Sequence, residues 1–314
     1  MKSFSKKNIL VTGGAGFIGS HLVDNLLEQG HKVVIIDNLS AGKKENINAR
    51  AKFYKKDITD FKIGNIFRKE KPEMVFHFAA HIEARQSVKD PIFDAKANIL
   101  GSLNILENCR SVGVKKIVFA SSGGEIYGRA KVMPTPEDYL PCPLSPYGVA
   151  KLAFEKYLDS YFMMYNIGYL ALRYGNVYGP RQNPFGEAGV VAIFANNMLQ
   201  GKQCVIHGSG KQTKDYIFID DAIKVTMAAC NKNINGIINV ATGRETSVME
   251  IFNKLKKITG FKKEAKHIPL PTGVLKRGAL SIKKAKRAIR WQPQYNLDKG
   301  LSSTVDWFKK QHEK

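Results

Sequence analysis

Residues 12–19 are Thr-Gly-Gly-Ala-Gly-Phe-Ile-Gly, and they separate an expected buried strand at 8–12 from an expected helix at 17–29. In such a loop the first glycine permits a tight turn, the second lets the backbone approach a pyrophosphate, and the third lets helix and strand pack closely. The start of the helix then offers free N–H groups and the positive end of its dipole to the phosphates. The stretch therefore predicts a dinucleotide-binding βα unit, in preference to a plain glycine turn.

An acidic residue, Asp37, ends the next expected strand, 32–37. A carboxylate there is suited to accept hydrogen bonds from the ribose hydroxyls of a dinucleotide, whereas it would repel a 2′-phosphate. The sequence therefore predicts NAD as the cofactor in preference to NADP.

Short apolar strands alternate with longer amphipathic stretches through the first half of the chain. Further strands are expected at 74–78, 116–120 and 169–173, and further helices at about 93–112 and 147–165. Repeated βα units with near-continuously apolar strands form a parallel sheet that is covered by helices on both faces. We therefore predict an α/β fold with a doubly wound parallel sheet of the Rossmann type over residues 1–173.

Beyond residue 173 the alternation loosens, and glycine and proline interrupt residues 174–189. Shorter elements then lead to a C-terminal helix at about 301–310. We predict that 174–314 form a smaller substrate-binding lobe, from which the segment at about 215–241 returns to the Rossmann domain. In folds of this class, ligands bind at the carboxyl edge of the sheet.

The basic composition of the chain requires no nucleic-acid partner. The 314 residues carry a formal net charge of +22, but the lysines and arginines are scattered, and only 283–287 form a dense run. A nucleic-acid-binding protein would gather them on one element with aromatic residues between them. A solvated basic surface explains the charge, and it attracts anionic ligands.

The sequence also indicates where the protein works. No stretch approaches the roughly 18 consecutive apolar residues of a membrane span. The first seven residues lack the apolar core of a signal peptide, and the four cysteines form no Cys-x-x-Cys pair. We therefore expect a cytoplasmic protein with no membrane partner, disulfide framework or metal site.

Tyr147 and Lys151 lie four residues apart in an expected helix, so both face the same side of it. Tyrosine has a pKa of about 10 and is a poor base at neutral pH. A neighbouring ammonium and an oxidised nicotinamide stabilise its phenolate, and a fall of about three pKa units corresponds to roughly 4 kcal/mol. Ser122 follows the expected strand 116–120 and can hydrogen-bond the same substrate hydroxyl. We predict Ser122, Tyr147 and Lys151 as the catalytic set.

These segments together resemble the extended short-chain dehydrogenases/reductases, and among them the NAD-dependent nucleotide-sugar epimerases and dehydratases. The resemblance extends from about residue 8 to residue 308. It is carried by the motifs TGGAGFIGSHLV at 12–23, DNLS at 37–40, DI at 57–58, FAA at 78–80 and SPYGVAK at 145–151. The stretches RYGNVYGPRQ at 173–182 and GEAGVVAIF at 186–194 are similar to those of compact bacterial UDP-glucose 4-epimerases.

The resemblance implies that Tyr147 takes the proton of the sugar 4-hydroxyl while NAD accepts hydride from carbon 4. The 4-keto sugar then turns over in the pocket, and hydride returns to its opposite face. NAD is regenerated in each cycle and stays bound. The implied substrate is UDP-glucose or UDP-galactose.

The same resemblance implies two sets of binding residues. The implied NAD contacts are Gly13, Gly16, Phe17, Ile18, Gly19, Asp37, Asn38, Ser40, Gly42, Asp57, Ile58, Phe78, Ala79, Ala80, Asn98, Tyr147, Lys151 and Tyr174. The implied substrate contacts are His81, Ser122, Asn176, Gly189, Val190, Val205, His207, Lys214, Arg277 and Gly278. Among these, Asn176 is expected at the sugar or diphosphate, and Val205 and His207 at the uracil.

Three positions depart from the family pattern. Lys214 replaces an arginine at the diphosphate and loses the planar two-pronged contact. Pro271 occupies the place of a second diphosphate arginine, for which Lys276 or Arg277 can compensate. Gly278 stands where a bulky residue excludes N-acetyl sugars in some members. These departures leave 4-epimerisation of UDP-N-acetylglucosamine or UDP-glucuronate as alternatives.

Other functions are possible on the same fold. Sugar dehydratases follow the serine with an Asp-Glu pair, whereas Gly123 and Gly124 precede Glu125 here. A net oxidoreductase that releases NADH is a more distant alternative, and a non-catalytic dinucleotide sensor has no need of the catalytic set. Family members are commonly dimers through a four-helix bundle, so we expect a homodimer through the helices at about 93–112 and 147–165.

Overall fold

The computed structural model describes residues 6–185, 189–232, 234–271 and 275–313. Residues 1–5 of the N-terminal segment and 186–188 of the epimerase-like stretch lie outside the described residues. The chain divides into two compact units. The first comprises residues up to 126, 143–173 and 223–238, and the second comprises 127–142, 174–222 and the chain from 239 onward.

The elements of the first unit follow the expected alternation. They are β1 (Asn8–Thr12), α1 (Phe17–Glu28), β2 (Lys32–Asp37), η1 (Lys44–Asn46), β3 (Lys52–Lys55), η2 (Phe61–Ile63), α2 (Gly64–Glu70), β4 (Met74–His77), α3 (Ala84–Lys89), α4 (Pro91–Ala95), η3 (Lys96–Leu100), α5 (Gly101–Val112), β5 (Lys116–Ser122), α6 (Gly123–Ile126), α7 (Pro146–Tyr165), β6 (Gly168–Tyr174), most of α9 (Ile219–Asn231) and most of β11 (Gly236–Val240).

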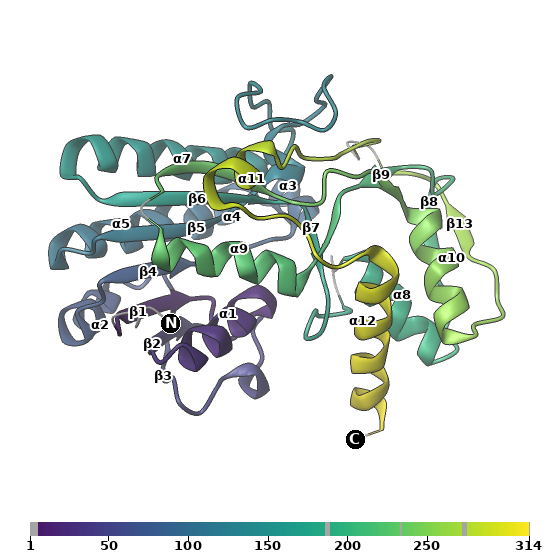
Figure 1. The fold of residues 1–314 in the computed structure, drawn as a ribbon, viewed down its shortest axis with the longest axis horizontal. Helices are drawn as coiled ribbons and strands as arrows, with labels where there is room; N and C mark the ends of the chain where they lie inside the picture. The colour runs from purple at the N-terminus through teal and green to yellow at the C-terminus, as the bar shows by residue number, and fades with distance from the viewer. Residues whose placement is uncertain (1–5, 186–188, 233, 272–274, 314) are drawn as a thin grey trace. The chain divides into compact units, whose positions relative to one another are not determined.

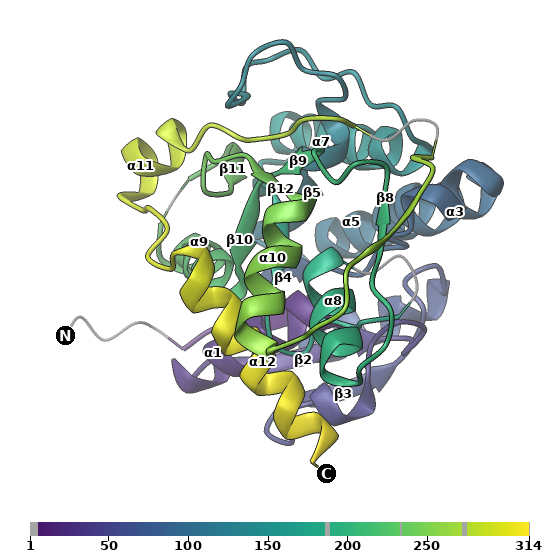
Figure 2. The same ribbon diagram turned by 90° about the vertical axis from the view of Figure 1, so that its right-hand side faces the viewer.

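The elements of the second unit are shorter on average. They are β7 (Asn176–Tyr178), α8 (Val190–Leu199), β8 (Val205–His207), β9 (Thr213–Lys214), β10 (Tyr216–Phe218), β12 (Thr246–Ser247), α10 (Val248–Thr259), β13 (Lys266–Ile268), α11 (Lys283–Ile289) and α12 (Leu297–His312). Helices α8, α10 and α12 pack side by side (Figure 2). Phe194 of α8 meets Phe252 of α10 edge to face, with ring centroids 5.7 Å apart.

The first unit is built on a seven-stranded sheet with the order β11-β6-β5-β4-β1-β2-β3 (Figure 1). β1 pairs in parallel with both β2 and β4, and the outer pairs β2–β3 and β4–β5 are parallel too. Because the chain moves from β1 to β2 on one side and later returns to β4 on the other, the winding reverses at β1. Ligands of doubly wound sheets bind at this reversal. The structure confirms the predicted fold class.

Helix α7 is capped at both ends by its own sequence. The Ser145 hydroxyl accepts a hydrogen bond from the Gly148 N–H at 3.2 Å, and Pro146 occupies the first turn, where its missing N–H costs nothing. Asn166 ends the helix in the left-handed conformation, with a φ of 53°. These signals fix where the first turn of α7 lies.

The expected helix at 93–112 consists of three consecutive segments, α4, η3 and α5. The middle one, η3, is a π-helix. π-helical turns are rare and are often found at functional sites. The sequence of η3, Lys-Ala-Asn-Ile-Leu, carries no signal that separates it from an ordinary helix.

Residues 127–142 group with the second unit, although the expected boundary placed them in the Rossmann domain. Thr135 exchanges backbone hydrogen bonds with Ala279 and Ser281, each at 2.8 Å. The Tyr127 hydroxyl donates to Asn239 at 2.9 Å. These bonds join segments far apart in the chain, so no local pattern predicts them.

Two further properties follow from the described part of the chain. No helix in it combines the length and the apolarity that crossing a membrane requires. In the same residues, no three His, Cys, Asp or Glu side chains are grouped so as to hold a metal ion.

Candidate active site

The glycine loop leaves no room for side chains. Gly13 has a φ of +70°, and a Cβ on it would lie 2.6 Å from the backbone nitrogen of Ala79. A Cβ on Gly19 would lie 2.1 Å from the carbonyl oxygen of Gly13. Gly16 precedes α1, and no side chain of the described residues caps this helix, so its first N–H groups can bind phosphate. The loop fits the pyrophosphate of a dinucleotide.

Asp37 lies at the carboxyl end of β2. Its side chain is buried, and its two oxygens accept hydrogen bonds from the N–H groups of Ala15 at 3.0 Å and Leu39 at 2.8 Å. Each carboxylate oxygen can accept a further hydrogen bond, so ribose hydroxyls can still bind. A Cβ on Gly42 would lie 3.0 Å from Oδ1 of Asp37, so a glycine is needed for this close packing. These residues fit the adenosine half of NAD.

A polar cluster gathers the expected adenine-side residues from the loops after β2 and β3. Asn38 donates to Asp57 at 2.7 Å and accepts from the Ser40 N–H at 2.9 Å. Thr59 donates to Asp57 through its N–H at 2.8 Å and its hydroxyl at 2.7 Å. Ile58, between them, is buried. The structure brings these residues together, and their contact with NAD stays a prediction.

The other expected cofactor contacts lie at element ends. Phe17 and Ile18 begin α1, Phe78, Ala79 and Ala80 follow β4, and Tyr174 ends β6. Asn98 is placed differently, because it is buried inside η3. Its side chain accepts from the His81 N–H at 2.9 Å and donates to the His81 carbonyl at 2.8 Å. Asn98 therefore fixes the backbone that follows β4.

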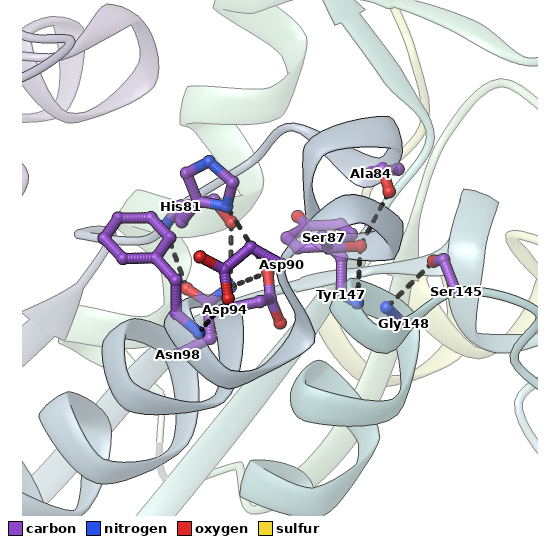
Figure 3. A network of polar contacts seen from close by, with 10 residues as sticks. His81, Ala84, Ser87, Asp90, Asp94, Asn98, Ser145, Tyr147 and Gly148 are labelled. Atoms are coloured by element: carbon purple, nitrogen blue, oxygen red, sulfur yellow. Dashed lines mark hydrogen bonds and ion pairs between the residues drawn. The ribbon is translucent and has the colours of Figure 1, made fainter.

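Ser122, Tyr147 and Lys151 meet at the carboxyl end of β5. Ser122 ends that strand, and its side chain is close enough to Tyr147 to lower the pKa of the phenol. The Lys151 Nζ donates to the Ala120 carbonyl at 2.9 Å and lies 5.6 Å from the centroid of the Tyr147 ring. The backbone N–H of Tyr147 donates to the Ser87 hydroxyl at 3.2 Å (Figure 3). The structure thus assembles the three residues that the sequence predicts as the catalytic set.

Burial shifts the pKa values of Tyr147 and Lys151. Burial raises the pKa of Tyr147, as do the carboxylates of Glu125 and Asp94, whereas the side chain of Ser122 lowers it. Burial lowers the pKa of Lys151 to about 7, although nearby carboxylates act in the opposite direction. Tyr147 therefore keeps its proton at neutral pH until a further positive charge comes close. The ring of an oxidised nicotinamide is such a charge.

Two buried carboxylates near the pair were not predicted. Glu155 pairs with Arg173 through bonds of 3.0 and 2.6 Å and accepts from Ser121 at 2.6 Å. Its position four residues after Lys151 on the same helix is the sequence signal that could have indicated it. Asp94 lies 3.4 Å from Nδ1 of His81, an expected substrate contact whose side chain is 18% exposed. No sequence signal separates Asp94 from an exposed helix acid.

Three of the expected substrate contacts gather around β9 in the second unit. β9 pairs with β12, placing Lys214 opposite Thr246. The guanidinium of Arg277 donates to both oxygens of Glu245, at 2.9 and 2.5 Å. The nearest atom to a Cβ on Gly278 would be the Thr213 carbonyl oxygen at 4.0 Å, so the space around this glycine is open. The ion pair of Arg277 was not predicted.

The remaining expected substrate contacts lie on other elements of the second unit. Asn176 begins β7, and its N–H donates to the Asp215 carbonyl at 2.7 Å. Gly189 precedes α8 and Val190 begins it, whereas Val205 and His207 are the ends of β8. Their contact with a nucleotide stays a prediction.

Proteins of known structure are similar to this chain in sequence and fold over nearly its whole length. A family model described as NAD dependent epimerase/dehydratase matches residues 9–241. The structure of UDP-glucose 4-epimerase from Thermotoga maritima with UDP-glucose is 48% identical, with a TM-score of 0.95, and the match covers 97% of this chain and 99% of that one. The UDP-glucose 4-epimerase of Thermus thermophilus in complex with NAD is 41% identical, with a TM-score of 0.92 and coverage of 96% and 98%.

A third solved structure has a different substrate in its name. It is the UDP-N-acetylglucosamine 4-epimerase of Methanobrevibacter ruminantium in complex with UDP-N-acetylmuramic acid. It is 35% identical, with a TM-score of 0.93, and the match covers 98% of this chain and 100% of that one.

The close approach at Gly19 makes the loop testable. In Gly19→Ala, the new Cβ would lie 2.1 Å from the Gly13 carbonyl oxygen, so the loop must move. We expect NAD affinity to fall at least about tenfold, which is about 1.4 kcal/mol, in calorimetric titration of cofactor-stripped protein. Gly113→Ala is the control, because its Cβ would have no atom within 4 Å and only its φ of +74° opposes the change. Undiminished affinity in Gly19→Ala would contradict the assignment of the loop.

Proposed function

The chain belongs to the NAD dependent epimerase/dehydratase family, and we propose that it interconverts UDP-glucose and UDP-galactose by transient oxidation at carbon 4. The observation that carries the proposal is the assembly of Ser122, Tyr147 and the buried Lys151 in the same unit as a glycine loop that fits a dinucleotide. The similarity to two UDP-glucose 4-epimerases at 48% and 41% identity over nearly the whole chain supports the same substrate. In this proposal the first unit binds NAD, and the second holds the nucleotide sugar.

Proton transfer at the sugar 4-hydroxyl is the step assigned to Tyr147. Ser122 lowers the pKa of the phenol and, in this proposal, hydrogen-bonds the same sugar hydroxyl. The Lys151 ammonium, fixed by the Ala120 carbonyl and lying 4.7 Å from the centroid of the Phe119 ring, stabilises the phenolate. Bound NAD supplies the acceptor and donor of hydride at carbon 4. After the keto sugar turns over, Tyr147 returns the proton.

We assign Lys214 and Arg277, which lie around β9, to binding the diphosphate of the substrate. Both side chains carry positive charge, and Glu245 holds the Arg277 guanidinium through two hydrogen bonds. Because Arg277 has further N–H groups, it can still donate to a phosphate oxygen. Anchoring the nucleotide in this way would leave the sugar ring free to turn over.

UDP-N-acetylglucosamine is a second candidate substrate, and Gly278 is the observation that favours it. Open space around this glycine leaves room for an N-acetyl group. A sugar dehydratase is disfavoured, because Ser145 donates to Glu125 at 3.2 Å and ties that lone carboxylate to the cap of α7.

We also infer a homodimer in the cytoplasm. α7 packs against α4 and η3, and these segments expose large apolar side chains that would be buried in a four-helix bundle. Leu100 is 60% exposed, Met163 77% and Met164 58%. Large apolar side chains exposed on helices that pack together are typical of a protein interface. The four cysteines are free thiols, which suits a reducing compartment.

Removal of the phenol tests the proposed chemistry. Tyr147→Phe keeps the ring but loses the proton acceptor, so we expect turnover to fall at least about a hundredfold while NAD remains bound. Proton NMR follows the conversion of UDP-glucose without added cofactor, and NAD is assayed after denaturation. Tyr157→Phe is the matched control, an exposed tyrosine on the same helix, and it should keep full turnover. Full turnover in Tyr147→Phe would contradict the mechanism, and continuous release of NADH would favour a net oxidoreductase.

Filling the space at Gly278 tests the substrate. Gly278→Tyr should lower kcat/KM for UDP-N-acetylglucosamine at least about tenfold more than for UDP-glucose, because only the former needs room for the acetamido group. The comparison of the two sugars in one variant controls for general damage to the loop. An equal loss of kcat/KM for both sugars would show that Gly278 does not determine substrate specificity.

Sedimentation tests the dimer. The expected mass is twice the 35.0 kDa of the chain. Met164→Glu should shift the protein toward the monomer, because it would bury a charge in the interface. Phe61→Glu replaces another exposed apolar residue, in η2, and should leave the mass unchanged. A monomeric mass for the unmodified protein would contradict the proposal.

A further inference from the structure

Asp94 is a buried carboxylate that the proposed proton transfer does not use. Only 1% of it is exposed. Its Oδ1 accepts a hydrogen bond from Asn98 at 2.9 Å and lies 3.4 Å from Nδ1 of His81. Among the described residues, its Oδ2 has no hydrogen-bond partner although it is buried. A buried carboxylate with an unpartnered oxygen is costly, so a role beyond packing is expected of it.

The position of Asp94 connects it with the catalytic pair. It lies in α4, which packs against α7, the helix that carries Tyr147 and Lys151. In Figure 3, dashed lines join Asp94 to His81 and Asn98, whereas the contact drawn for Tyr147 is with Ser87. The charge of Asp94 acts on both Tyr147 and Lys151. Asp94 is therefore placed to influence both members of the pair at once.

The other carboxylates near the pair are already engaged. Glu125 acts on Tyr147 and accepts a hydrogen bond from Ser145, and Glu155 acts on Lys151 and is paired with Arg173. The remaining charged side chains of α3, α4 and η3 are Arg85, Lys89 and Lys96, and all are exposed. The neighbours of Asp94 that can carry positive charge are thus Lys151 and, when protonated, His81.

We propose that Asp94, oriented by His81 and Asn98, is a positioning residue that supplies the buried counter-charge of the Tyr147–Lys151 pair. Its negative charge favours the protonated form of each partner. It keeps Lys151 as an ammonium in a site whose burial opposes that charge, and it holds the proton on Tyr147 until a positive nicotinamide is present. This inference rests on the proposed function, because it assigns Asp94 to the same proton transfer.

The sign of the effect follows from electrostatics. In Asp94→Asn a negative charge is removed, so the deprotonated forms of Tyr147 and Lys151 become more favourable. The pKa of both groups must then fall, and both limbs of the pH profile of kcat/KM move to lower pH. We expect a shift of at least about half a pH unit, as a nearby unit charge produces.

The direct test is the titration of Tyr147 in the NAD-loaded protein. Phenolate absorbance is recorded against pH for proteins with and without Tyr147→Phe, and their difference isolates this tyrosine. The same pair of proteins is then prepared with Asp94→Asn in both. The titration midpoint of Tyr147 should be lower in this second pair by at least about half a pH unit. Asp90→Asn is the matched control, because Asp90 is an exposed carboxylate four residues away, and its variant should leave the midpoint unchanged.

An unmoved midpoint in folded Asp94→Asn protein would overturn the proposal, and so would an equal shift in Asp90→Asn, which would show a general charge effect. If Asp94→Asn does not fold, Asp94→Ser removes the same charge with a smaller side chain and is judged by the same criterion. If Asp94→Asn lost turnover while both limbs of its pH profile of kcat/KM stayed in place, Asp94 would have only a structural role, and the proposal would be wrong. The absorbance titration needs no sugar substrate, so it decides the inference even if the protein converts no UDP-hexose.

Discussion

The burial of one ammonium group, at Lys151, is the constraint on which the site depends. Lys151 is only 4% exposed, and taking an ammonium out of water costs several kcal/mol unless other groups replace the water. The carbonyl of Ala120 and the face of the Phe119 ring do so here. Strand β5 and the caps of α7 hold these groups in place. The packing of the first unit therefore stabilises the buried ammonium.

The same burial makes the basicity of Tyr147 conditional. A phenol in this environment keeps its proton, because burial and two nearby carboxylates raise its pKa. In the proposed mechanism it becomes a base when positive charge is added beside it, and the charge of a nicotinamide exists in the oxidised state alone. Tyr147 is therefore most acidic, and gives up its own proton most readily, while NAD is oxidised and the sugar awaits oxidation. Once the cofactor is reduced, the phenol holds a proton more tightly. This coupling ties the protonation of Tyr147 to the redox state of one bound cofactor.

Local patterns were enough to predict the parts of the fold that build the site. The glycine loop, the strands on either side of α1, and the spacing of Tyr147 and Lys151 are all encoded within short stretches, and the structure places them as expected. The unpredicted features depend on packing between distant segments. The π-helix at 96–100 is one, and the pairing of Arg277 with Glu245, 32 residues apart, is another. The substrate contacts lie in such regions, so they follow from resemblance and not from pattern.

In the proposed 4-epimerisation, the hydrogen on carbon 4 leaves and returns as hydride without reaching water. UDP-glucose carrying deuterium at carbon 4 tests it most directly, with the protein in ordinary water and the products read by mass spectrometry and NMR. We expect UDP-galactose to form with its deuterium fully retained at carbon 4. Product that has lost the label to solvent would contradict it, because the hydrogen would then have left as a proton.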